Sequence, residues 1–275
     1  MKLIKIQNPA IKTLYLVVQY LSNAALCYLS KQENDSHLNL RFSAIERNIN
    51  VVLSEDPRNV LSFNYTRLTL EWTNSSTTKI MRLNGAKHKD ILRWIRKVSK
   101  ESGYEKKYSY LATNKLKFPI TDTYLYAFPA VDELDRIMKL WTSAYEAIGS
   151  ALKHHNIRKQ ISLKPYSLCS SVKVEYPLMK NTLVDFGFAI PDEFSDEHYY
   201  YIKCYGVKRI LWVSNMKPLK VGYWINKGFQ GAILPAKDIT KEMVKFFLKE
   251  VLEAFQNKLE KRSDKHFFRL VRIFV

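Results

Sequence analysis

Residues 61–72 read Leu-Ser-Phe-Asn-Tyr-Thr-Arg-Leu-Thr-Leu-Glu-Trp, and this stretch decides the fold of the first half of the chain. Apolar residues stand at every second position, with one change of phase between Tyr65 and Leu68. Such alternation predicts two strands, each with one apolar face and one polar face. Strands of this kind form an antiparallel sheet whose apolar face is covered by helices.

The residues on either side of this stretch predict a helix–meander–helix half. We expect helices at about residues 9–31 and 87–102, because apolar residues recur there at intervals of three and four. Three more strands are predicted between these helices, at Leu38–Phe42, Ile49–Leu53 and Lys79–Leu83.

The second half of the chain repeats this order. After a connector at 111–130, we expect a helix at Asp132–Lys153 and a last helix at about 238–259. The strands predicted between these two helices are Ser170–Tyr176, Leu183–Ile190, Tyr199–Tyr205, Arg209–Val213 and Gly231–Leu234.

The sequence therefore predicts an α+β protein with two similar helix–antiparallel meander–helix halves, 1–110 and 131–260. We expect them to pack as one unit and to be related by a pseudo-twofold axis, because Ser36–Phe42 and Ser170–Tyr176 open their sheets with similar patterns. A basic and apolar tail, 261–275, follows. We expect this tail to pack as an edge strand, to dock on another subunit or to bind a membrane surface.

The chain is strongly basic. Its 275 residues include 44 Lys and Arg against 26 Asp and Glu, which gives a net charge of +18. Such a surplus attracts nucleic acid, anionic lipid or acidic protein. The helix at 87–102 has the clearest basic face, which we expect to be a polyanion-binding surface or a solvated outer face. The residues of this face are Lys89, Arg93, Arg96, Lys97 and Lys100.

The three cysteines, Cys27, Cys169 and Cys204, are far apart and include no Cys-x-x-Cys pair. This spacing excludes a zinc ribbon and a thioredoxin-type site and favours a reducing compartment. No apolar run reaches the length that spans a bilayer. We expect a cytoplasmic protein.

No motif of the sequence indicates a catalytic or cofactor site. The chain has no P-loop, no dinucleotide-binding glycine pattern and no Gly-x-Ser-x-Gly motif. The acidic loop 192–198 has the highest density of possible metal ligands, but it lacks EF-hand spacing, so we expect a solvated turn. We expect neither a metal nor a cofactor.

Three stretches carry a family resemblance over roughly residues 36–236. They read Ser-His-Leu-Asn-Leu-Arg-Phe at 36–42, Glu-Tyr-Pro at 175–177 with Gly-Phe-Ala-Ile-Pro-Asp at 187–192, and Ile-Asn-Lys-Gly-Phe-Gln-Gly-Ala-Ile-Leu-Pro at 225–235. In this order they resemble an uncharacterised family of bacterial proteins. The family has Ser-His-Thr-Asn-Leu-Gly-Trp, then Trp-Pro-His-His-Phe-Asp with Gly-Leu-Ser-Pro-Gly-Asp, and then His-Thr-Glu-Gly-Trp-Thr-Gly-Ala-Val-Leu-Pro.

The resemblance implies a polar site that this chain keeps only in part. The paired His with a nearby Asp, and the His and Glu of the last stretch, suit metal binding or acid–base catalysis. At those positions this chain has Leu178–Asn181 and Ile225–Lys227. His37 and Asn39 are kept, together with turn residues such as Gly228.

We therefore expect a non-catalytic or catalytically depleted protein that binds a small ligand or a protein partner in a cleft between the halves. The ligand-binding residues predicted from motif position are His37, Asn39, Tyr176, Asn181, Trp224 and Asn226. One alternative is an enzyme with an unrecognised site, such as a metal-assisted hydrolase. The other is a polyanion-binding protein that uses the basic helix face, with nucleic acid as the less favoured partner. The oligomeric state does not follow from the sequence.

Overall fold

The computed structural model contains helices and two antiparallel sheets, of five and six strands, so the predicted α+β class is confirmed. The chain divides into two compact units, Met1–Thr142 with Ser162–Cys169 and Ser143–Ile161 with Ser170–Val275. Side chains of Val131 and of residues 261–271 are not described. The residues that the structure describes are 8–33, 35–110, 120–128, 131–154, 157, 159–175, 182–206 and 210–271.

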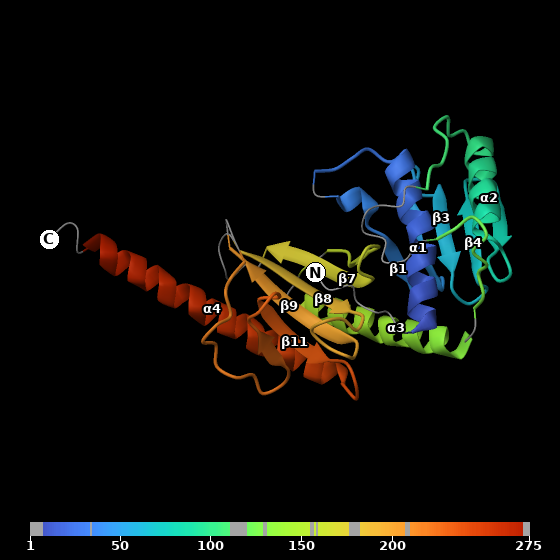
Figure 1. The fold of residues 1–275 in the computed structure, drawn as a ribbon. Coiled ribbons are helices and arrows are strands. Elements are labelled where there is room, and N and C mark those ends of the chain that lie inside the picture. Colours follow the sequence, from blue (N-terminus) through green and yellow to red (C-terminus); the bar gives the residue numbers. More distant parts are fainter. Residues whose placement is uncertain are drawn as a thin grey trace. The chain divides into compact units, whose positions relative to one another are not determined.

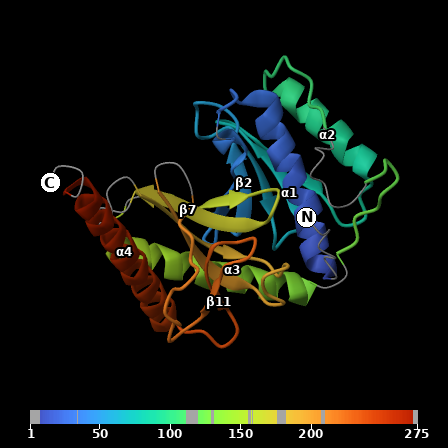
Figure 2. The same cartoon turned by 60° about the vertical axis from the view of Figure 1, so that its left-hand side comes forward.

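In the first unit, a five-stranded meander lies against the long helix α1, Pro9–Tyr28 (Figures 1 and 2). The strands neighbour one another in chain order. The helix α2, His88–Glu101, contacts the last strand, β5. The strands are β1 Arg41–Ser43, β2 Asn48–Val52, β3 Val60–Asn64, β4 Thr69–Thr73 and β5 Thr78–Arg82.

The alternation in residues 61–72 gives this meander its two faces. Leu61 of β3 lies opposite Trp72 of β4, and both side chains are buried. The next pair, Ser62 and Glu71, points to the other face because successive side chains of a strand alternate. The helix α1 packs on β2 and β3, so the predicted helical cover is present.

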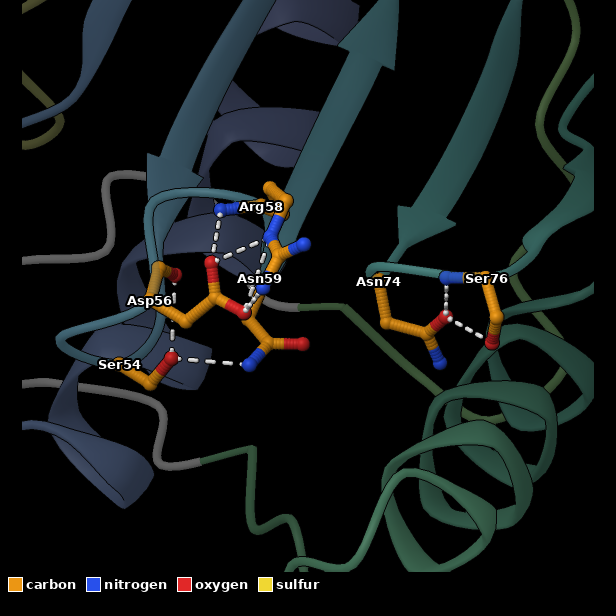
Figure 3. A network of polar contacts seen from close by, with 6 residues as sticks. All are labelled: Ser54, Asp56, Arg58, Asn59, Asn74 and Ser76. Atoms are coloured by element: carbon orange, nitrogen blue, oxygen red, sulfur yellow. Dashed lines mark hydrogen bonds and ion pairs between the residues drawn. The ribbon is translucent and has the colours of Figure 1, made fainter.

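Short polar networks close two loops at one end of the meander (Figure 3). In the loop between β2 and β3, the Asp56 carboxylate accepts hydrogen bonds from the backbone N–H of Arg58 at 3.0 Å and from its guanidinium at 2.9 Å. In the loop between β4 and β5, the Asn74 side-chain oxygen accepts from the backbone N–H groups of Ser76 and Thr77 at 3.0 and 2.9 Å. Local bonds of this kind fix the turns and therefore the strand register.

The helix α1 is buried on all sides, whereas its spacing predicted one apolar stripe. The polar side chains of Gln19 and Asn23 are buried with the apolar ones. Gln19 Nε2 donates to the Pro165 carbonyl at 2.9 Å, and Asn23 Nδ2 donates to the Gln19 carbonyl at 2.8 Å. Burial of these amides is tolerated because they have hydrogen-bond partners.

The six-stranded sheet has the order β10-β11-β9-β8-β7-β6. Apart from Cys169 at the start of β7, its strands β7 to β11 belong to the second unit, where α4, Lys241–Val271, contacts β9 and β11. The long helix α3, Val131–His154, runs through both units. The strands are β6 Ser162–Lys164, β7 Cys169–Glu175, β8 Leu183–Ala189, β9 Tyr199–Tyr205, β10 Tyr223–Ile225 and β11 Gly231–Pro235.

The first predicted strand is wrong at its start. His37 lies in a short 3-10 helix, η1, Ser36–Leu38, and the strand begins only at Arg41. Leu38 and Leu40 continue the two-residue period into this turn, which made the strand look longer.

The predictions for the end of the chain also need correction. In the described part of Arg209–Val213, the predicted strand is reduced to an isolated bridge between Tyr205 and Ile210. The predicted edge strand in the tail is wrong as far as Val271, because α4 continues to that residue. Across the part of the chain that the structure describes, no helix combines the length and apolarity needed to cross a membrane.

Gly187 provides a test of the packing in the second unit. It pairs with Ser171 on one side and Tyr201 on the other. A Cβ atom at this position would lie 2.4 Å from the Ser170 carbonyl oxygen and 2.7 Å from Cζ of Tyr201. We expect Gly187→Ala to lower the free energy of unfolding by about 1–3 kcal/mol, measured by urea denaturation, because overpacking of this size shifts backbone or ring.

Gly149 in α3 is the matched control. A Cβ atom added there meets nothing within 4 Å. We expect Gly149→Ala to raise the free energy of unfolding by about 0.5–1 kcal/mol, because alanine loses less backbone entropy in a helix. Equal effects of the two substitutions would contradict the described approach of Tyr201 to Gly187.

Candidate polyanion-binding surface

The outer side of α2 presents the basic residues that the sequence singled out. Their spacing places them on one side of a helix, because residues three and four apart are neighbours on its surface. The opposite side is apolar and buried, through Ile91, Leu92, Ile95 and Val98. All five basic residues are exposed, and we call them the α2 basic face: Lys89, Arg93, Arg96, Lys97 and Lys100.

Two acidic residues of α2 neutralise part of this face. Asp90 forms an ion pair with Arg93 at 3.1 Å. Glu101 is shared between Lys79 of β5 and Lys97, with the Lys97 contact at 4.0 Å. Exposed pairs of this kind contribute only about 0–1 kcal/mol, so a phosphate can compete for Arg93 and Lys97.

The remaining charge of the α2 basic face has no acidic partner. Lys89 and Lys100 form no ion pair with any residue that the structure describes. Lys106 and Lys107 are exposed just beyond the helix. Over residues 87–107 the chain has eight basic and three acidic residues. The excess of positive charge is therefore present in residues 87–107 as well as in the chain as a whole.

The first turn of α2 offers no free backbone donors to an anion. The N–H of His88 donates to the Tyr124 carbonyl at 2.8 Å, and the N–H of Lys89 donates to the Asp122 carbonyl at 3.2 Å. Helix N-termini bind anions through such N–H groups when the groups are free. An anion on α2 would consequently be held by side chains.

The last turn of α2 fixes the direction of the chain that follows. Gly103 has a φ of +84°, a left-handed conformation that suits glycine, and the N–H of Tyr104 donates to the Ser99 carbonyl at 3.0 Å. The chain then returns along the helix, so that Nε of Arg96 donates to the Tyr108 carbonyl at 3.2 Å. This bond orients the Arg96 guanidinium.

The inner side of α2 is anchored to α1 by a buried phenol–imidazole pair. The Tyr20 hydroxyl lies 2.6 Å from Nδ1 of His88, and both side chains are buried. The Tyr108 hydroxyl donates to the Tyr20 carbonyl at 3.2 Å. The Tyr20 ring also contacts the rings of Tyr110 and Tyr126, with centroids 5.4 and 6.0 Å away.

Burial perturbs the titration of this aromatic cluster. It raises the pKa of Tyr20, Tyr108 and Tyr126 far above the ordinary value for a phenol. Burial also lowers the pKa of His88, and the nearby Arg96 guanidinium acts in the same direction. The cluster is therefore uncharged at neutral pH, as a core requires.

Two of the predicted ligand-binding residues lie in the first unit and serve a turn. Nδ1 of His37 accepts a hydrogen bond from the backbone N–H of Gln32 at 3.2 Å. The backbone N–H of Asn39 donates to the Ser36 carbonyl at 3.1 Å and ends η1. Both side chains are half-buried.

Two more of the predicted ligand-binding residues lie in the second unit. Nε1 of Trp224 donates to the Lys217 carbonyl at 2.8 Å, and its ring meets Phe255 edge to face. Asn226 is exposed in the turn after β10, where its carbonyl accepts from the Gln230 side chain.

The last two predicted ligand-binding residues, Tyr176 and Asn181, lie outside the described residues. The described members of the set are divided between the two units, His37 with Asn39 and Trp224 with Asn226. Their convergence on one ligand therefore stays a prediction.

The described segments contain no group of three or more His, Cys, Asp or Glu that could hold a metal ion. In the acidic loop, Asp192 accepts from the N–H of Phe194 at 2.9 Å and from the Tyr199 hydroxyl at 2.8 Å. Burial raises the pKa of Cys204 to about 12, so its thiol stays protonated at neutral pH.

The aromatic anchor of α2 was not predicted from the sequence. Tyr20 and His88 are 68 residues apart, and no periodic pattern links two such positions. The one signal in the sequence is the density of tyrosine in the segments that flank α2, at Tyr104, Tyr108, Tyr110, Tyr124 and Tyr126.

Comparisons with known proteins identify no family for this chain. No protein-family model matches it. Searches of curated proteins and of solved structures found no significant match either. The resemblance to the bacterial family therefore stays a hypothesis.

The anchor predicts a specific loss of stability. Tyr20→Phe removes the hydroxyl that pairs with His88 and leaves a buried imidazole nitrogen without that partner. We expect the free energy of unfolding to fall by about 1–3 kcal/mol, measured by urea denaturation at pH 7.5.

The control is Tyr223→Phe, which removes a hydroxyl from a side chain that is 45% exposed. Its effect on the free energy of unfolding should stay within about 0.5 kcal/mol. If Tyr20→Phe were as mild as this control, the Tyr20–His88 pair would not be an anchor.

Proposed function

We propose that this protein binds nucleic acid through the α2 basic face, which holds the phosphate backbone with ammonium and guanidinium groups. One observation carries the proposal: five basic side chains are exposed on one side of α2, and the two acidic residues of the helix are already paired. Phosphate contacts of this type supply most of the affinity of non-specific nucleic-acid binding.

The length of the α2 basic face suits a phosphate backbone. Lys89 and Lys100 are separated by eleven residues, or about 17 Å of helix axis at 1.5 Å per residue. A duplex carries one phosphate per about 3.4 Å of axis on each strand, so about five phosphates span this length. The number of cations and the number of phosphates along the helix are therefore similar.

An anionic membrane is less favoured as the partner of α2. A helix that lies in a membrane interface buries its apolar side in the lipid. The apolar side of α2 is already buried in the first unit, through residues such as Ile91 and Ile95. Only the basic side of α2 is available to a partner. A basic surface without exposed apolar residues favours contact with the phosphate backbone of nucleic acid over insertion into lipid.

The residue types on α2 also favour a contact that does not read sequence. Trp94 is the only Trp, Tyr or Phe in the helix, and it is half-buried. Exposed aromatic side chains that stack on unpaired bases are typical of single-strand binding. Because the α2 basic face has none, we propose duplex nucleic acid as the partner.

The small-ligand hypothesis has no comparable support within one unit. Its described residues are divided between the units, and His37 and Trp224 already bond within their own turns. The proposal therefore rests on α2.

The salt dependence of binding tests the proposal. The triple variant Lys89→Ala, Lys97→Ala, Lys100→Ala removes three cations, and alanine preserves the helix. We expect wild type to bind a 20-base-pair duplex DNA with an affinity that falls steeply with salt. In the variant, the slope of log K against log salt should be shallower by about 2–3, because each lost phosphate contact changes it by about 0.9. Fluorescence anisotropy at several salt concentrations measures this slope.

The control triple variant is Lys153→Ala, Lys217→Ala, Lys237→Ala, whose residues are exposed in the second unit. It loses the same net charge but leaves the α2 basic face intact, so its slope should stay near that of wild type. Equal losses in both variants would show that general charge, and not α2, binds the duplex. Failure of wild type to bind, or preference for anionic vesicles or an acidic polypeptide, would overturn the proposal.

A further inference from the structure

His88 begins α2, and its side chain lies in the core of the first unit. Its side chain is 3% exposed. Nδ1 faces the Tyr20 hydroxyl of α1 at 2.6 Å, and the imidazole meets the Tyr110 ring edge to face with centroids 4.8 Å apart. Its backbone N–H donates to the Tyr124 carbonyl. This one residue therefore connects α2 to α1 and to the segments that follow α2.

The charged groups near His88 are few and oppose one another. Asp122, from the segment 120–128, favours the charged imidazolium, whereas Arg96 of α2 disfavours it. The phenols of Tyr20 and Tyr110 stay neutral because burial raises their pKa. Burial has the largest effect on His88 itself, and together with Arg96 it outweighs Asp122, so the pKa of His88 lies below its ordinary value.

Protonation of His88 would weaken the contact between α2 and α1 in three ways. A protonated Nδ1 carries a hydrogen and can no longer accept from Tyr20, so the Tyr20 hydroxyl would have to turn its own hydrogen away and accept from Nδ1 instead. The imidazolium would be a buried charge among aromatic rings. It would also stand at the N-terminus of α2, where the helix dipole disfavours a cation.

We infer that His88 is an acid-sensitive latch: the neutral imidazole holds α2 against α1, and protonation of His88 loosens α2. For its effect on ligand binding the inference rests on the proposed function, because α2 carries the basic face. Acid should then weaken duplex binding. This direction is opposite to the usual gain in polyanion affinity when histidines become charged.

The sign follows from proton linkage. An exposed histidine has a pKa of about 6.5, and the native pKa of His88 is lower. The opened form therefore binds the proton more strongly than the closed form does. The packing of α2 against α1 is fully stable above pH about 6.5 and loses stability as the pH falls toward the native pKa of His88.

Hydrogen exchange of α2 in the full chain, without nucleic acid, tests the latch. Protection of peptides covering 88–101 is measured from pH 7.5 to 5.0, corrected for intrinsic exchange, against peptides of β3 and β4. In wild type, we expect α2 protection to fall by up to about tenfold for each pH unit below about 6.5, with a smaller change in the strands.

His88→Gln is the informative variant, because the glutamine carbonyl can accept from Tyr20 and the side chain does not titrate. Its α2 protection should not change with pH. His37→Gln, which removes a half-buried histidine outside α2, should behave like wild type. The latch is overturned if His88→Gln keeps the same pH dependence as wild type.

A second measurement does not depend on the variant folding. The imidazole resonance of His88 in wild type, followed by NMR against pH, should titrate below 6.5 or remain neutral until α2 opens. A titration at or above pH 6.5 would overturn the latch. If wild type does not bind the duplex at any pH, the proposed function is overturned. The hydrogen-exchange result would still show whether protonation of His88 loosens α2.

Discussion

The helix α1 is buried on every side, and the first unit is arranged to satisfy this constraint. A helix with an exposed side can leave its polar residues in water, but α1 has no such side. Its amides bond to backbone carbonyls, as Gln19 does with Pro165, and its Tyr20 hydroxyl bonds to His88. The meander covers α1 through β2 and β3, and α2 with its flanking segments meets it at Tyr20.

The contact between α2 and α1 consequently differs from an ordinary apolar contact. Leucine and isoleucine packing is non-directional and tolerates small rotations of a helix. A bond of 2.6 Å between Tyr20 and His88 is directional and fixes one residue of α2 relative to α1. Because the outer side of the same helix carries the basic face, fixing His88 also fixes which way Lys89 and its neighbours point.

The sequence was informative where the structure repeats over short distances. The two-residue period in 61–72 predicted β3 and β4, and the helical period in 87–102 predicted both sides of α2, because these patterns arise from neighbours along the chain. The short strands β6 and β10 were missed because three residues show no clear period. The anchor at Tyr20 and His88 was missed for a different reason: it depends on two residues brought together only by the tertiary fold.

The candidate site follows the same rule: features that lie on one segment could be predicted from the sequence, and features that join distant segments could not. The α2 basic face could be read from one segment, since all five cations lie on one helix. The predicted ligand set drew on motifs from both units, and His37 and Trp224 already form bonds within their own turns. Motif order along a chain indicates which residues are shared with a family, but a binding site also requires that their polar atoms face a common space. On α2 the five cations are exposed on one helix, and among them only Arg96 is held from the core side, by its bond to the Tyr108 carbonyl.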